Sequence, residues 1–338
     1  IPEDLFEEIV RLIGYDAIPS IVPRMAIRQP QRDPLAEALC AFRTRLVFEF
    51  SFRETQNYAF IRPQTIAACG FSLSDHIQLE NPLSKERPYL CRSLIPNLLE
   101  GVEKNQQKEK RHAYFEIARV FLKEGAYAAS PSDRSPSLPA QPTHLGLVYA
   151  HHAHQQLMPY LVTLVQTVCQ QSGYPVTLEP TTERGWWQQS RAVTVMVGET
   201  CVGHVGMVAS AACEHLGIPD PVVAAELDLS LLSTKPIHAQ TYELPGAFPA
   251  VLRDATLLVD ERVLYAQLFE TLKSAHPLIV RVEPLALYRD ASVGAGKKSI
   301  SFHIAYRHAE RTLTSDEVEG VHATVVATMK KKFNAVLR

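Results

Sequence analysis

The sequence lacks any uninterrupted apolar run near the roughly 20 residues that a membrane-spanning helix needs, and it shows no signal-peptide pattern. It also has little net charge, because 34 Lys and Arg stand against 36 Asp and Glu, a formal balance of −2. We therefore expect no membrane partner and no uniformly basic coat for nucleic acid. A local basic face remains compatible with this balance.

Recognisable catalytic motifs are also missing. The sequence contains no phosphate-binding G-x-x-x-x-G-K-[ST] loop and no G-x-S-x-G nucleophile elbow. Gly198, Gly203 and Gly206 are too scattered for a dinucleotide fingerprint. The six cysteines form no C-x-x-C pair and mostly lie among apolar neighbours. Spacing alone thus predicts no catalytic site, and the cysteines predict reduced, buried thiols in a cytoplasmic protein.

The length of 338 residues and the 46% hydrophobic content suggest two domains and a remnant of a third. The chain begins at Ile1, without Met and already at a predicted helix start, so we expect a piece of a longer protein. That helix runs from Glu3 to about Gly14. Its residues Asp4, Glu7 and Glu8 share one face and suit Mg²⁺, although spacing alone favours a solvated helix face.

The middle of the chain alternates helices with strands. Asp33 and Pro34 predict the cap and first residue of a helix. Further predicted elements are strands at 58–61, 77–79, 114–122, 145–149, 193–197, 201–208 and 223–229, and helices at 94–104 and 158–172. Residues 128–142 are predicted to be a mobile loop, and His151–His154 an exposed loop rather than a metal site. The pattern predicts an α+β domain with an antiparallel sheet.

The tail after Pro245 predicts the order βαββαβ of a ferredoxin-like domain, with a capping box formed by Thr314 and Glu317. Residues 248–338 hold 13 basic and 10 acidic residues, so this is the only part suited to a polyanion. Several basic residues could either contact phosphates or form an ordinary solvated surface, and charge alone favours the two interpretations equally: Arg253, Lys297, Lys298, Arg307, Arg311 and Lys330–Lys332. Tyr288, Phe302 and Tyr306 favour core packing over stacking on bases.

Three ordered sets of runs resemble the C-terminal part of the β subunit of bacterial phenylalanyl-tRNA synthetase. The first is Glu3–Pro19. The second comprises Asn81–Ser84, Leu90–Leu99, Asn105 and Phe115–Phe121. The third comprises Phe248–Asp254, Gly296–Ser299 and Arg311–Val318. Together they extend over nearly the whole chain.

The resemblance implies an α+β fold, in which a class II synthetase-like antiparallel core precedes a ferredoxin-like βαββαβ domain. Residues 1–24 would end a small preceding domain, 25–240 would form the non-catalytic core, and 245–338 the ferredoxin-fold anticodon-binding domain. The core lacks a Gly-rich, Arg-containing third class II motif. Phenylalanine activation and ATP would thus belong to a partner α subunit in an α2β2 assembly.

The resemblance also assigns sites. Asp4, Glu7 and Glu8 would contribute to a Mg²⁺ site, incomplete in this chain, because full coordination needs more ligands. The tail would dock tRNA(Phe), with Arg253, Lys297 and Lys298 as the phosphate contacts. Two alternatives remain: a self-sufficient enzyme with a ferredoxin-fold regulatory domain for a small molecule, and an assembly module without RNA contact.

Overall fold

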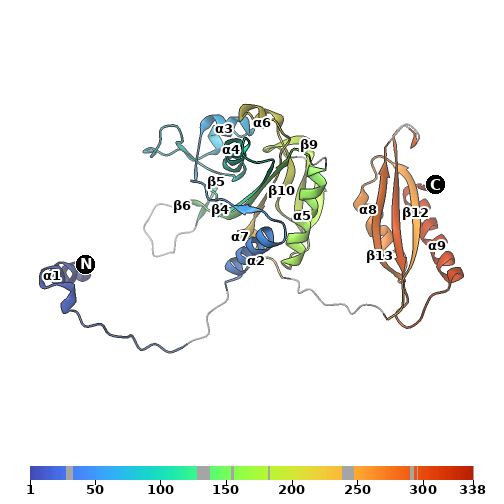
Figure 1. Cartoon of the computed structure of the whole chain (residues 1–338), viewed down its shortest axis with the longest axis horizontal. Coiled ribbons are helices and arrows are strands. Elements are labelled where there is room, and N and C mark those ends of the chain that lie inside the picture. Colours follow the sequence, from blue (N-terminus) through green and yellow to red (C-terminus); the bar gives the residue numbers. More distant parts are fainter. Residues whose placement is uncertain are drawn as a thin grey trace. The chain divides into compact units, whose positions relative to one another are not determined.

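The structure, a computed structural model, describes residues 1–27, 33–127, 138–153, 156–181, 183–237, 247–289, 293–294 and 296–337. The chain divides into two compact units, Ile1–Gln240 and Thr241–Arg338 (Figure 1). The first contains a large antiparallel sheet with helices, and the second a smaller sheet with two helices. The predicted mixed α+β class is therefore confirmed.

The first unit is built on a seven-stranded sheet in the order β1-β4-β7-β11-β10-β9-β8. Its strands are β1 (Arg53–Glu54), β4 (Arg111–Arg119), β7 (Thr143–His151), β8 (Thr177–Pro180), β9 (Trp187–Val197), β10 (Thr200–Val208) and β11 (Val223–Asp228). Only β1 pairs in parallel, with β4, and the other pairs in this sheet are antiparallel. The predicted hairpin closes at Gly198 and Glu199, where Val197 pairs with Thr200.

Helices cover both faces of this sheet (Figure 1). One face carries α2 (Pro34–Phe48), α5 (Leu157–Gln171) and α7 (Leu229–Leu232); the other carries α3 (Pro63–Ala68), α4 (Ile95–Asn105) and α6 (Ser210–His215). Alternation along β7 explains the two cores, since Leu147 packs toward α5 and Val148 toward α4. The Asp33 carboxylate caps α2 as predicted, accepting from the Leu35 amide at 3.0 Å.

Two predictions for residues 114–142 were wrong in detail. The predicted strand 114–122 is interrupted between β4 and β5 (Leu122–Tyr127). The Val120 amide still donates to the Pro142 carbonyl in the β4–β7 register, but Pro142 has no N–H to return, and the Phe121 amide donates instead to the Cys91 carbonyl, so the ladder ends there. Within the predicted loop 128–142, β6 (Leu138–Ala140) pairs with β5, and residues 128–137 lie outside the described ranges.

Short elements complete the first unit. β2 (Phe60–Ile61) pairs with β3 (Tyr89–Leu90), whereas the predicted strand at 77–79 is only a single bridge from Gln78 to Tyr89. α1 (Pro2–Ile13) forms as predicted and ends at Gly14, whose φ of 99° suits glycine. Short 3₁₀ turns occupy Tyr15–Ala17 and Leu73–Asp75. Among the described residues, the structure has no helix with the length and apolarity to span a bilayer.

The second unit follows the predicted βαββαβ order. Its elements are β12 (Val251–Asp260), α8 (Tyr265–Ser274), β13 (Ile279–Tyr288), β14 (Lys297–Tyr306), α9 (Ser315–Phe333) and β15 (Val336–Leu337). The antiparallel sheet runs β13-β14-β12-β15. Alternate residues of β14, among them Phe302 and Ile304, pack against both helices in one core. The capping box also forms, because the Thr314 amide donates to Glu317 at 3.0 Å and Thr314 Oγ1 accepts from the Glu317 amide.

Candidate nucleic-acid interface

The acidic stripe Asp4, Glu7 and Glu8 lies on α1, where all three residues are exposed. The Asp4 carboxylate contacts the Ile1 amino group at 2.6 Å, and the Glu8 carboxylate accepts from Arg11 at 2.5 Å. Within the described ranges, no group of three or more His, Cys, Asp or Glu side chains is arranged to hold a metal ion. By themselves, these acids therefore do not fit a complete Mg²⁺ site, which needs near-octahedral oxygen coordination.

Lys297 and Lys298 are the first two residues of β14, so their side chains leave opposite faces of the sheet. Lys297 is exposed and lies opposite Asp260. Lys298 lies on the face covered by the helices, is only 6% exposed and donates from Nζ to the Glu261 carbonyl at 2.8 Å. Burial lowers the pKa of the Lys298 ammonium. Of the pair, Lys297 is the one available to a phosphate.

Arg253 is half-buried on β12 and pairs with Ile304, seven residues along β14 from Lys297. At about 3.4 Å per residue, the two backbone positions are roughly 24 Å apart. The Arg253 guanidinium donates to the Leu252 carbonyl at 3.0 Å. The structure therefore places Arg253 and Lys297 at opposite ends of the small sheet and does not bring the three predicted contacts into one patch.

The end of α9 supplies further cations. Lys330 and Lys331 are exposed in its last turn, and neither makes a hydrogen bond or ion pair with another described residue. After α9, β15 begins with Val336, which pairs with Leu258 near the end of β12. Lys297 of β14 pairs with Asp260 at that same end. Lysines 297, 330 and 331 thus lie at the same end of the unit. Lys297 points away from the face that α9 covers, so the three lysines share an end of the unit but not one face. The run of three lysines was the sequence signal for the two on α9.

Other predicted cations are already engaged. Arg311 donates to both carboxylate oxygens of Glu317, at 2.9 and 2.7 Å, which holds the Glu317 pKa at about 2. Lys332 donates to Thr271 at 3.0 Å. These contacts tie the loop before α9 and the end of α9 to the fold, and they leave Arg311 and Lys332 less suited to phosphates.

The three strand aromatics separate into two groups. Phe302 and Tyr306 are fully buried, as predicted, and the Tyr306 hydroxyl lies 2.9 Å from His322 Nδ1. Tyr288 was expected in the core, but it is 55% exposed at the end of the edge strand β13. Tyr288 pairs with Ser299, which alternates with the core residue Ile300, so its ring lies on the face of the sheet that points away from the helices.

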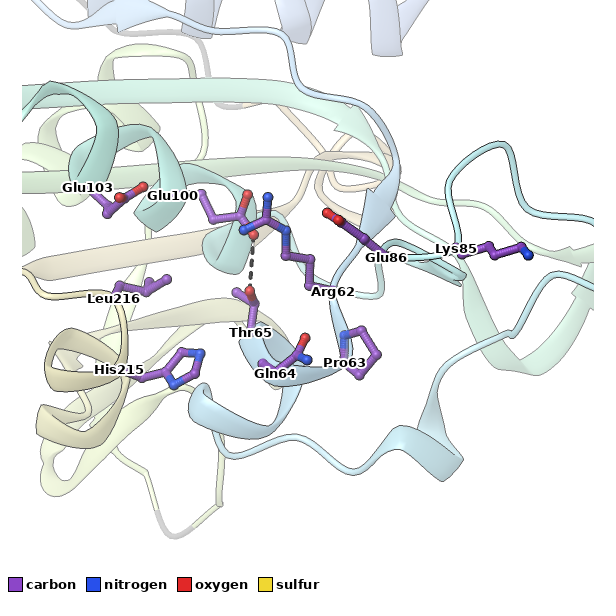
Figure 2. A pocket seen from close by; sticks show the side chains of 10 residues that line it. All are labelled: Arg62, Pro63, Gln64, Thr65, Lys85, Glu86, Glu100, Glu103, His215 and Leu216. Atoms are coloured by element: carbon purple, nitrogen blue, oxygen red, sulfur yellow. Dashed lines mark hydrogen bonds between the residues drawn. The ribbon is translucent and has the colours of Figure 1, made fainter.

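The first unit contains a cavity of about 590 Å³ that the sequence did not predict (Figure 2). Side chains from α3, α4 and α6 and the loop before β3 line it, and Figure 2 shows Thr65 donating to Glu100. Glu100 is 5% exposed and accepts from Thr65 at 3.0 Å and from Arg87. Because Thr65 and Arg87 already donate to its carboxylate, Glu100 serves as a buried structural anion.

The fold and its cations define a two-part α+β protein whose smaller part is a ferredoxin-like domain with a lysine-bearing end. A family model described as "Phenylalanyl tRNA synthetase beta chain CLM domain" matches residues 18–229, and one described as "Ferredoxin-fold anticodon binding domain" matches residues 246–338. The chain belongs to the phenylalanyl-tRNA synthetase β-chain family.

Curated relatives from the same family match the whole of this chain. It is 29% identical to the phenylalanine–tRNA ligase beta subunit of Geobacillus kaustophilus, covering 100% of this chain and 42% of that protein. It is 30% identical to the corresponding subunit of Anaeromyxobacter dehalogenans, covering 100% of this chain and 43% of that protein. The chain thus spans less than half the length of these relatives.

Among solved structures, pyrrolysyl-tRNA synthetase from Desulfitobacterium hafniense aligns with a TM-score of 0.45 and 18% identity, covering 58% of this chain and 66% of that chain. A likeness at this level carries no argument about function.

Proposed function

We propose that this chain is a non-catalytic part of the β subunit of a phenylalanine–tRNA ligase, which scaffolds the α subunit and docks tRNA(Phe) through its C-terminal domain. The observation that carries the proposal is the match of the whole of this chain to part of the β subunits, together with the two family models, in order along one chain. The division into residues 1–24, 25–240 and 245–338 is part of this proposal.

In this role, the lysine-bearing end of the second unit contacts the tRNA backbone. Lys297, Lys330 and Lys331 supply exposed charge at one end, and Arg253 supplies a separate contact. Lys298 supports the strand carrying Lys297 through its bond to the Glu261 carbonyl. Because phosphate contacts release counterions, tRNA affinity should fall steeply as salt rises.

Filter binding with tRNA(Phe) at several salt concentrations tests this docking. The variant Lys297→Glu should lower the affinity and flatten the salt dependence, since one phosphate contact changes the slope by about one unit. Lys273→Glu is the matched control, because Lys273 is exposed on α8 of the same unit. Equal affinities for all three proteins would count against this end of the unit and favour an assembly module without RNA contact.

The core supplies a scaffold rather than chemistry in this proposal. Phenylalanine activation and ATP belong to the α subunit in a cytoplasmic α2β2 enzyme. The comparisons give no support to the alternative, a self-sufficient enzyme with a regulatory tail. Phenylalanine-dependent ATP–pyrophosphate exchange by this chain alone should be absent, and exchange without any α subunit would overturn the proposal.

Asp4, Glu7 and Glu8 are proposed as one helix's share of a Mg²⁺ site that requires further oxygen ligands. The acids are exposed on α1, which leaves room for such ligands. Equilibrium dialysis should find no tight Mg²⁺ binding by this chain. A full-length β subunit should bind Mg²⁺ and lose it when Glu7 is replaced by Gln; unchanged binding would contradict the assignment.

A further inference from the structure

One face of the large sheet changes from apolar to polar along its strands. Toward α4 and α6, one transverse row is apolar: Tyr114, Val148, Ala224, Gly206 and Ala192. Two residues further along each strand, the parallel row is Glu116, Gly146, Glu226, His204 and Thr194. Ionisable side chains from β4, β11 and β10 therefore share one end of a face that is otherwise a hydrophobic core.

A cavity of about 300 Å³ opens on this polar end. Both tryptophans of the chain line it, together with His204, Glu226 and Asp228. The Trp187 ring stacks on the His204 imidazole, with centroids 4.6 Å apart and planes inclined by 26°. The cavity thus combines a flat aromatic wall with carboxylates, and its size suits a metabolite smaller than a nucleotide.

The polar groups of this cavity are only partly satisfied. Glu226 Oε1 accepts from the Leu94 amide and faces His144 Nδ1 at 3.1 Å, while Oε2 accepts only from Ser93, at 2.6 Å. A carboxylate oxygen accepts two hydrogen bonds, so one position on Oε2 is open.

Asp228 adds a second open position, and His204 has an unpaired nitrogen. Asp228 Oδ1 accepts from the Leu231 amide, but Oδ2 is 3.9 Å from the nearest imidazole nitrogen, that of His144. His204 Nε2 is buried and has no hydrogen-bond partner, although Glu183 lies 3.4 Å away. Two carboxylate oxygens are therefore open as acceptors, whereas His204 Nε2, enclosed and beside the Glu183 carboxylate, is placed to donate.

Two glycines allow the walls to approach closely. A Cβ on Gly203 would lie 2.0 Å from the Glu226 carbonyl, and one on Gly185 would lie 2.4 Å from the Trp187 ring. Neither position leaves space for a side chain. The backbone thus lies directly against the Glu226 carbonyl at Gly203 and against the indole at Gly185.

We propose that this cavity binds a small primary ammonium ion whose carbon skeleton carries a flat apolar ring. An ammonium group has three N–H donors, and the open positions on Glu226 Oε2 and Asp228 Oδ2 can accept from two of them. His204 covers one face of the Trp187 ring, so the ligand's ring packs against the indole surface that remains. Arg92 and Arg184 also line the cavity, and because Arg92 already pairs with Glu124 at 3.4 Å, a carboxylate on the same ligand would find its partner in Arg184.

Tryptophan fluorescence tests the proposal directly, because both indoles belong to this cavity. The full chain is titrated with phenethylamine, L-phenylalanine and 3-phenylpropionate, which share a ring and differ in charge. Phenethylamine should change the emission saturably, and 3-phenylpropionate should not. Binding of L-phenylalanine as well would identify an amino acid as the ligand, and binding of phenethylamine alone would identify a simple amine; both results support the proposal.

Glu226→Gln should raise the dissociation constant for phenethylamine at least about tenfold, because Gln keeps the shape of Glu but lacks its negative charge. Glu116→Gln is the matched control, since Glu116 is buried in the same row but does not line the cavity. If Glu226→Gln fails to fold by circular dichroism, Asp228→Asn replaces it, because Asn also caps α7.

Three results would overturn the proposal: no saturable change with either amine, equal binding of 3-phenylpropionate, or equal weakening by the Glu116 and Glu226 variants. No tRNA or α subunit enters the titration, so its outcome is independent of the proposed function.

Discussion

Phe302 and Tyr288 offer a contrast between a core residue and a surface residue of the same small sheet. Phe302 is fully buried on β14, with the Tyr265 ring stacked 5.9 Å away, whereas Tyr288 is 55% exposed. Replacing a buried Phe by Ala costs about 3–5 kcal/mol of unfolding free energy. With an urea m-value of about 1.5 kcal/mol per M for a unit of this size, Phe302→Ala should lower the midpoint by roughly 2–3 M.

The positions of the tryptophans make this prediction specific. Both Trp186 and Trp187 belong to the first unit, so their fluorescence follows that unit, while circular dichroism follows both. Phe302→Ala should shift the dichroism transition of the second unit and leave the fluorescence transition in place. Tyr288→Ala should change neither transition by more than about 0.5 kcal/mol, and should weaken tRNA binding about fivefold or more if the ring stacks on a base.

The reasoning is refuted if Phe302→Ala leaves the second unit's transition unchanged, or if it shifts the tryptophan transition by a similar amount. The first result would mean that Phe302 is not in a packed core. The second would mean that the two units unfold as one.

Three further predictions follow from single contacts. Thr314→Ala removes the cap of α9 and should destabilise the second unit by about 1 kcal/mol in urea unfolding; no change would argue against the capping box. Burial lowers the pKa of the His144 imidazole, but the Glu226 and Asp228 carboxylates outweigh burial, so its folded-state pKa is raised. The stability that the protonated imidazole contributes is therefore fully present below about pH 6.5 and is lost as the pH rises through the folded-state pKa. Urea titrations at several pH values should show a smaller decline for His144→Gln than for the unaltered chain. A thiol reagent should label Cys40 and Cys201 rapidly and the four buried cysteines only after unfolding, and more than two rapid thiols would contradict the packing.

The second unit was predictable almost element by element, because its strands alternate and its last helix carries a capping signal at Thr314. Most of the large sheet was also predictable, since β7, β10 and β11 are apolar runs with clear ends. Short elements were missed where tertiary contacts decide the structure. β6 forms in a Ser- and Pro-rich stretch through its pairing with β5, which local composition does not report.

The sites were less predictable than the fold. Strand alternation alone separates Lys297 from Lys298, but burial of Lys298 depends on the Glu261 carbonyl, 37 residues earlier. The polar end of the large sheet joins Glu116, Glu226 and His204 from strands far apart in the sequence. Only the register of the sheet brings such residues together, so no local motif marks them.

Co-purification with an α subunit tests the central claim most directly. This chain and a tagged cognate phenylalanyl-tRNA synthetase α subunit are co-expressed, captured through the tag and separated by size, with a full-length β subunit as the control. The account predicts that the chain elutes with the α subunit. Separate elution of this chain, under conditions in which the full-length β subunit is captured, would contradict the claim that it scaffolds the enzyme.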